Sequence, residues 1–110
     1  MSIFEKIIKK EIPADIVFEN EKVIAIKDIS PQAPVHLLII PKKKIKDIQS
    51  VKEDDFSLIS ECIKVCQKLA EEFNILDGYR LLTNNGTGAG QTIFHLHFHL
   101  LGGRTLGILG

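Results

Sequence analysis

The stretch FHLHFHLLGG, residues 94–103, alternates apolar residues with three of the four histidines of the chain. Successive side chains of a β-strand point to opposite faces of the sheet, so residues two apart share a face. The alternation therefore predicts a strand over residues 94–101 that presents His95, His97 and His99 on one surface. We expect the alternate apolar side chains to be buried and to fix the register of the strand: Phe94, Leu96, Phe98 and Leu100.

The chain has 110 residues, of which 45% are hydrophobic and 25% charged, as expected for one folded domain over residues 1–110. Fourteen basic side chains balance fourteen acidic ones, whereas nucleic-acid binding usually requires a large basic excess. No apolar run approaches the ~20 residues of a membrane-spanning helix, and the charged N-terminal segment differs from a signal peptide. We therefore expect a protein that binds neither nucleic acid nor membranes.

Cys62 and Cys66 lie four residues apart in a helical pattern, where a disulfide would be strained. A buried pair of thiols in a reducing cytoplasm is the favoured interpretation, and a redox or metal role is the alternative. The sequence thus predicts a cytoplasmic location.

Local patterns predict two helices and five strands. Ser2 and Glu5 fit a capping box, and an apolar stripe follows, so we expect a short helix that ends before Pro13. A second capping box at Ser50 and Glu53 is expected to begin a longer amphipathic helix. Alternating or β-branched runs predict strands at 15–19, 22–28, 36–40, 79–84 and 94–101. This order predicts an α+β domain with helices packed on an antiparallel sheet.

The longer helix carries two adjacent apolar seams. One contains Phe56, Ile59, Ile63, Cys66, Ala70 and Phe73, and the second contains Leu58, Cys62, Val65 and Leu69. The combined apolar sector is wider than contact with one sheet requires. Either the helix is pressed deeply into its own core, or the second seam meets a partner subunit.

Three interpretations of the histidine row compete. A polar sheet face that happens to be histidine explains one imidazole better than three in register. A zinc site is disfavoured because Cα atoms four residues apart on a strand lie ~13 Å apart, too far for bonds of roughly 2 Å to join His95 and His99. Two of the three with His36 would still need another ligand, and no carboxylate or thiolate stands nearby. A neutral imidazole oriented by its neighbours is, by contrast, a good nucleophile near neutral pH.

A glycine-rich segment, NNGTGAGQT at residues 84–92, precedes this strand. Its glycines allow the backbone to approach a ligand closely, and turn amides form anion-binding nests. No lysine follows the last glycine, so the segment is not a Walker A loop. A flexible hairpin connection is one interpretation. The functional one places amide donors and Thr92 where a phosphate meets His97.

The row His95-Leu96-His97-Phe98-His99-Leu100-Leu101 resembles the signature of the histidine-triad (HIT) superfamily. Together with DISPQAPVH at 28–36, NNGTGAGQT and Gly102-Gly103-Arg104, it is similar to the Hint branch, the histidine-triad nucleotide-binding proteins. The likeness covers nearly the whole chain. It implies a five-stranded antiparallel sheet with two helices, and a homodimer in which the sheets join and the long helix lies at the interface.

The resemblance implies hydrolysis of the P–N bond of purine nucleoside phosphoramidates, such as adenosine 5′-monophosphoramidate, and of related aminoacyl-adenylates, with neither metal nor cofactor. His97 would attack the α-phosphorus to form a nucleotidyl-histidine that water resolves. His99 would contact the phosphate and assist departure of the amine, and His95 and His36 would support the constellation. The implied nucleotide-binding set comprises these two reacting histidines and Phe98, the ribose-binding Asp28, a phosphate loop of Asn84, Gly90, Gln91 and Thr92, and a base pocket of Phe4, Ile7, Ile12, Ile26 and Ile29.

Single positions leave alternatives open. Asp28 before Ile29-Ser30-Pro31 also fits a plain turn, and the base-pocket residues also fit a plain core. The lysines at 42–44 fit a solvated strand end better than a patch that steers an anionic substrate.

Three positions depart from the family pattern. Lys44 stands where many Hint proteins place a histidine, Thr92 replaces the usual serine, and the tail TLGILG lacks the usual Trp-Pro-Pro character. His99 is retained where the nucleotidyltransferase branch carries glutamine, which favours hydrolysis over transfer. The rival function is a nucleotide-binding or scaffold protein with little catalytic activity.

Overall fold

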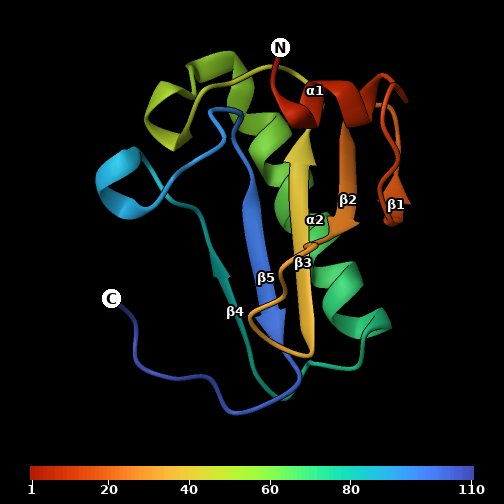
Figure 1. The fold of residues 1–110 in the computed structure, drawn as a ribbon, viewed down its shortest axis with the longest axis vertical. Coiled ribbons are helices and arrows are strands. Elements are labelled where there is room, and N and C mark those ends of the chain that lie inside the picture. Colours follow the sequence, from red (N-terminus) through yellow and green to blue (C-terminus); the bar gives the residue numbers. More distant parts are fainter.

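A five-stranded antiparallel sheet in the order β1-β2-β3-β5-β4 forms the centre of the computed structural model, which describes residues 1–110 (Figure 1). The α+β fold expected from the sequence is therefore confirmed. No helix combines the length and apolarity that crossing a membrane requires. The principal elements are α1 (Ile3–Ile8), β1 (Ile16–Glu19), β2 (Val23–Lys27), β3 (Val35–Pro41), α2 (Phe56–Glu72), β4 (Tyr79–Leu82) and β5 (Phe98–Gly102).

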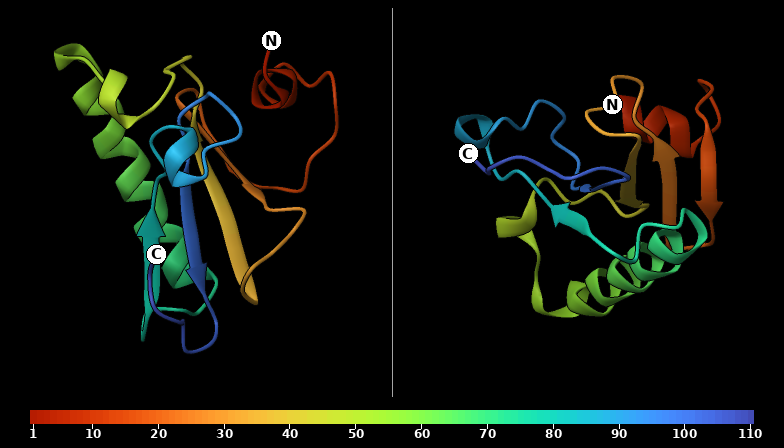
Figure 2. Two further views of the ribbon diagram at one scale, coloured as in Figure 1. Left: turned by 60° about the vertical axis from the view of Figure 1, so that its left-hand side comes forward. Right: turned by 90° about the horizontal axis from the view of Figure 1, so that it is seen from below.

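The two helices cover opposite faces of the sheet (Figure 2). Side chains of α2 pack with Leu37, Ile39 and Leu100 in an apolar cluster of 14 buried residues. On the other face, α1 covers a cluster of six, in which Leu38 is a neighbour in sequence of Leu37 and Ile39. Because strand side chains alternate between faces, β3 contributes to both clusters.

The capping box that the sequence predicts at the start of α1 is confirmed. The Ser2 hydroxyl accepts from the Glu5 backbone N–H at 3.2 Å, and the Glu5 carboxylate accepts from the Ser2 N–H at 2.9 Å. Phe4 and Ile7 point from this helix into the sheet and are buried. The cap thus fixes the helix that brings Phe4 over the histidines.

The second predicted capping box is wrong. Ser50 ends a short 3-10 turn, and its hydroxyl donates to the Asp47 carboxylate at 2.7 Å instead of capping α2. A further 3-10 turn over Glu53–Asp55 leads into α2, which begins at Phe56. Aspartate and serine compete for local backbone hydrogen bonds, so the acidic segment forms two short turns before the helix starts.

The partner-subunit interpretation of the second seam on α2 is also wrong. Cys62, Val65 and Leu69 of that seam are buried against the sheet in this chain. Phe56 and Ile63, from the other seam, are the large apolar side chains that α2 leaves exposed. The wide apolar sector therefore has one half in the core and part of the other half in solvent.

Strand β5 is shorter than the sequence predicts. It begins at Phe98, so His95 and His97 lie in an irregular segment ahead of the ladder. The alternation survives in part, since Leu96, Phe98 and Leu100 are buried in the α2 cluster, whereas Phe94 is partly exposed. The irregular segment is held by the Leu96 N–H, which donates to the Ile45 carbonyl, and by the His97 carbonyl, which accepts from the Thr83 hydroxyl.

Candidate active site

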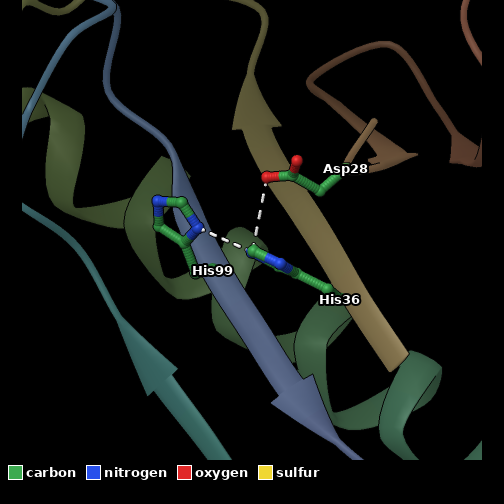
Figure 3. Close-up of side chains that lie close together, drawn as sticks. All are labelled: Asp28, His36 and His99. Carbon is green, nitrogen blue, oxygen red and sulfur yellow. Dashed lines mark hydrogen bonds and ion pairs between the residues drawn. The ribbon is translucent and has the colours of Figure 1, made fainter. Parts of the chain in front are cut away.

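His36 and His99 meet on the sheet face that α1 occupies. Leu38 pairs with His99 in the antiparallel register of β3 and β5, which places His36, two residues earlier, diagonally beside His99. The His36 Nε2 and His99 Nδ1 atoms lie 2.9 Å apart, and the ring centroids are 5.2 Å apart (Figure 3). The sequence prediction that His36 joins the histidine group from the third strand is therefore confirmed.

The tautomer of His36 follows from its surroundings. The Gln32 backbone N–H donates to His36 Nδ1 at 3.0 Å, so this nitrogen carries a lone pair. In the neutral ring the proton then sits on Nε2, which donates to His99 Nδ1. The Asp28 Oδ2 atom, 3.4 Å from the same Nε2, favours a proton there as well.

His99 consequently carries its own proton on Nε2, because its Nδ1 accepts from His36. No group of the chain accepts a hydrogen bond from this Nε2–H. It is thus a free donor.

His97 has the opposite arrangement. Its Nδ1 lies 2.7 Å from the His95 carbonyl oxygen, which only accepts, so the proton sits on Nδ1 and Nε2 holds a lone pair. Phe4 contacts the ring edge-on, with centroids 4.9 Å apart. The His97 and His99 rings are neighbours, with centroids 5.1 Å apart. The site therefore presents an unprotonated nitrogen beside an N–H donor.

Burial lowers the pKa of both rings. Desolvation is the main cause for His97, partly offset by its hydrogen bond to the His95 carbonyl. The pKa of His99 falls to about 4, because burial is reinforced by the neighbouring His97 and His36. Both imidazoles are accordingly neutral near pH 7, as nucleophilic attack by a ring nitrogen requires.

His95 is buried completely, which the predicted surface row of three histidines did not anticipate. Its Nε2–H donates to the Pro41 carbonyl at 2.7 Å, and its Nδ1 has no hydrogen-bond partner. Burial lowers its pKa. The ring therefore anchors the segment, and the backbone carbonyl of His95 is the part that contacts His97.

Asp28 combines the two interpretations that the sequence left open. Its Oδ1 accepts from the Ser30 backbone N–H at 2.8 Å and so forms a turn. Its Oδ2 faces His36 on the functional side of the sheet. One carboxylate oxygen is thus structural, and the other is available to the site.

Asp28, His36 and His99 also form the one group whose candidate metal-ligating atoms all lie within 4.8 Å of one another. The prediction that no carboxylate lies near the histidines is wrong, because Asp28 lies beside His36. The tautomers nevertheless oppose a metal here. His36 Nε2 would have to offer a lone pair, which requires a proton on Nδ1, and that proton would face the Gln32 N–H.

The glycine-rich segment forms a loop with a 3-10 turn at Thr87–Ala89. Gly86 and Gly90 have φ values of 87° and 95°, which favour glycine. The Gln91 side chain is buried and holds the loop closed: its Oε1 accepts from the Gly86 N–H, and its Nε2 donates to the Lys46 and Ile93 carbonyls. Any contact of Gln91 with a ligand would therefore come through its backbone.

The amides that follow Gln91 are the donors of this region. No backbone N–H from Thr92 to His95 donates to an acceptor within the chain, whereas those of Gln91 and Leu96 do. Thr92 is exposed and Asn84 half-buried. Four successive free amides thus lead from the loop to His97.

The residues expected around a purine base fall into two groups. Phe4, Ile7 and Ile26 are buried in the six-residue cluster under α1, and Ile12 packs against it. Ile29, next to Asp28, is 95% exposed. The first group is consistent with the plain-core alternative, although Phe4 also contacts His97. Among the residues expected around the base, Ile29 is thus the one whose side chain is exposed and accessible to a ligand.

Three partners of the site were not predicted: the Gln32 amide, the Pro41 carbonyl and Arg104, which donates to the Gln32 carbonyl at 2.7 Å. The first two act through backbone groups: every residue type supplies a carbonyl, and every type except proline supplies an N–H. The motif DISPQAPVH contains Gln32, but no side-chain pattern marks its amide as a donor.

Comparison with known proteins agrees with this geometry. The HIT domain family matches residues 9–106. The chain belongs to the HIT family. A HIT-like protein of Chlamydia pneumoniae is 56% identical over 109 residues, covering 99% of each chain. An uncharacterized HIT-like protein of Synechocystis is 47% identical over 103 residues, covering 94% of this chain and 90% of its own.

Solved structures of HIT proteins superpose closely on this one. A HIT family hydrolase from Clostridium thermocellum is 50% identical with a TM-score of 0.94, over 98% of this HIT chain and 95% of its own. A histidine triad nucleotide-binding protein from Candida albicans is 35% identical with a TM-score of 0.83, over 100% and 84% of the two chains. The sequence-based resemblance to the superfamily is thereby confirmed, and these neighbours support a HIT-type nucleotide hydrolase.

Proposed function

We propose that this HIT protein is a Hint-type hydrolase of purine nucleoside 5′-phosphoramidates, such as adenosine 5′-monophosphoramidate, and of related aminoacyl-adenylates. One observation carries the proposal: His97 holds a free lone pair beside a free N–H of His99. A nucleophile next to a hydrogen-bond donor is the arrangement that displacement of an amine from phosphorus needs.

The reaction then proceeds in two steps. His97 Nε2 attacks the α-phosphorus and the P–N bond breaks, which leaves a nucleotidyl-imidazolium whose Nδ1–H donates to the His95 carbonyl. The departing nitrogen takes up one proton, delivered at His99 and replaced there from solvent. Water next attacks phosphorus, the P–Nε2 bond breaks, one proton returns to solvent, and neutral His97 and the nucleoside monophosphate remain.

The surroundings support a nucleotide as substrate. Free amides between Thr92 and His95 suit an anionic phosphate, and the Asp28 carboxylate suits ribose hydroxyls. Among solved neighbours, the protein from Candida albicans is described as nucleotide-binding, and that from Clostridium thermocellum as a hydrolase. The exposed Ile29 and the cluster under α1 supply apolar surface for a base.

We also propose a homodimer joined along β4 and α2. β4 is an edge strand, and an unpaired edge readily pairs with another chain. Four large apolar side chains lie on these elements with exposed fractions from 37% to 56%: Phe56, Ile63, Leu81 and Tyr79. Sedimentation should give a dimer that Leu81→Lys dissociates, and a monomeric wild type would contradict the proposal. We propose a cytoplasmic location as well, because Cys62 and Cys66 are buried free thiols, which are typical of a reducing compartment.

Mass spectrometry of an acid-free, rapidly quenched reaction tests the function. We expect one nucleotidyl adduct per subunit, located on His97, and release of AMP that a chelator does not reduce. The matched control is His95→Asn, which removes a buried ring that holds no lone pair toward solvent and should still form the adduct. Binding of AMP with neither adduct nor turnover on any phosphoramidate would instead establish the rival function, a nucleotide-binding protein with little catalytic activity.

A further inference from the structure

The loop that connects β2 to β3 sets the tautomer of His36, yet it is exposed. Residues 29–32 lie at the surface, and the loop bonds internally at two points: Ser30 N–H to Asp28, and the Gln32 side-chain amide to the Ser30 carbonyl. Neither bond holds the Gln32 backbone against the sheet. An exposed turn with so few internal hydrogen bonds needs a further anchor if its amide is to stay aimed at His36.

Arg104 supplies that anchor. Its Nη2 donates to the Gln32 carbonyl at 2.7 Å, and its Nη1 donates to the carbonyl of the adjacent Thr105 at 2.9 Å. Arg104 forms no ion pair, so its charge strengthens bonds to neutral carbonyls only. The guanidinium therefore joins the C-terminal tail to the one loop residue whose amide contacts a site histidine.

Gly103 directs the chain toward this contact. It has a φ of 94°, and a Cβ built on it would lie 2.9 Å from the Cβ of Pro34. Only glycine combines that backbone conformation with so close an approach to the loop. The turn after β5 thus packs on the β2–β3 loop and carries Arg104 to Gln32.

We propose that Arg104 is a positioning residue: by holding Gln32 it fixes the proton of His36 on Nε2, which keeps the proton of His99 on the free Nε2. If the Gln32 amide moved away, His36 Nδ1 would lose its donor. A proton on His36 Nδ1 would leave two lone pairs facing each other across 2.9 Å, unless His99 moved its own proton to Nδ1. The two rings therefore change tautomer together, and the changed pair offers the substrate a lone pair in place of a donor.

The tail contains a matched control. Arg80, from β4, donates through Nη2 to the Gly107 carbonyl at 2.8 Å, so it also ties an arginine to a tail carbonyl. It makes no hydrogen bond or ion pair with the β2–β3 loop. Arg80 and Arg104 both line an open pocket of about 550 Å³ between the tail and β4. Removing Arg80 frees the tail without freeing Gln32.

Long-range ¹H–¹⁵N correlation spectra of the imidazoles test the inference without any substrate. At about pH 8, where the rings are neutral, we expect wild type to show unprotonated Nδ1 in His36 and His99 and unprotonated Nε2 in His97. Arg104→Ala should move the His36 and His99 nitrogens toward averaged shifts, Arg104→Lys should lie between, and Arg80→Ala should match wild type. Amide spectra establish that each variant is folded.

Kinetics supply the second readout, and this arm rests on the proposed function. We expect Arg104→Ala to lower kcat about tenfold with little change in KM, since the substrate still binds but meets the wrong tautomer. Added guanidinium ion should restore part of kcat in Arg104→Ala, and Arg80→Ala should keep the wild-type kcat.

The outcomes separate the two proposals. Unchanged His36 and His99 nitrogens in folded Arg104→Ala, or the same change in Arg80→Ala, would overturn the inference. So would altered tautomers with an unaltered kcat. If wild type turned over no phosphoramidate, the proposed function would fail, and the nitrogen spectra alone would decide whether Arg104 fixes the tautomers.

Discussion

The two faces of the sheet differ in how completely they are covered. On one face, α2 closes a cluster of 14 buried apolar residues. On the other, the short α1 covers six, contributed by α1, β2 and β3, and the rings of His97 and His99 stay half-buried beside them. Consecutive residues of the same strands supply both faces. Alternate residues of one strand therefore serve core packing on one face and the histidine site on the other. Substitutions on the α2 face should mainly change stability, and substitutions on the histidine face should mainly change turnover.

The largest effect should come from the histidine face. We expect His97→Ala to lower kcat for a nucleoside phosphoramidate by about 10⁴-fold or more, since the one other ring nitrogen with a free lone pair, His95 Nδ1, is completely buried. On the energy scale this is about 5.5 kcal/mol in the barrier. Because His97 is half-buried, the free energy of unfolding in urea should change far less. Wild-type turnover in His97→Ala would show that His97 is not the nucleophile.

Leu100→Ala tests the opposite face. Leu100 is fully buried under α2, so its truncation should lower the free energy of unfolding by about 2–5 kcal/mol. It lies next to His99 in sequence but points away from it, and kcat per folded molecule should stay near wild type. Urea denaturation and active-site titration measure the two quantities. Equal losses of stability and kcat would mean that the faces are not separable.

Acidification should lower both the stability and the turnover of the protein by protonating the histidines. Burial lowers the pKa of His36, His95, His97 and His99 below the unfolded value, so the unfolded chain takes up protons first. The stabilisation that neutral rings provide is complete above about pH 6.5 and is lost as pH falls toward the folded pKa values, which for His99 is about 4.

The urea midpoint should therefore decrease as the pH is lowered from about 6.5 to 5, an interval that lies above the pKa values of ordinary carboxylates. The decrease should be less steep in His99→Gln. Over the same interval kcat/KM should begin to fall only below pH 6.5, because protonation of His97 is displaced to lower pH. An acid limb centred above the ordinary histidine pKa would contradict the burial of this ring.

The smallest effect should come from the cap of α1. Ser2→Ala removes the acceptor of the Glu5 N–H and should cost about 1 kcal/mol of stability. Because Phe4 of this helix contacts His97, a change in KM or kcat of more than a few-fold would show that α1 also positions the nucleophile. Ser57→Ala, an exposed serine within α2, is the control and should change neither quantity.

Residue patterns predict much of this molecule. The order of helices and strands, the alternation at Leu96, Phe98 and Leu100, and the arrival of His36 beside His99 follow from periodicity and family resemblance. These features depend on side-chain types that recur at fixed spacing, which a sequence displays directly.

The remaining features depend on hydrogen bonds to backbone atoms and on which of several similar side chains becomes buried in the folded chain. Burial of the His95 ring, the tautomer set by Gln32 and the anchor at Arg104 all use carbonyls or amides, which leave no residue signature. Helix α2 begins later than the sequence predicts, because Asp47 and Asp55 accept hydrogen bonds from the nearby Ser50 and Lys52 amides and form short turns instead. Which seam of α2 faces the core was also not decidable, since both are apolar.

The late start of β5 has a chemical consequence. In a regular antiparallel ladder, the carbonyl of each residue is committed either to a neighbouring strand or to the edge, perpendicular to the side chains. His95 lies outside the ladder, and its carbonyl turns instead to its second neighbour's imidazole. Because β5 begins only at Phe98, the His95 carbonyl is free to accept from His97 Nδ1, and this hydrogen bond decides which nitrogen of His97 can react.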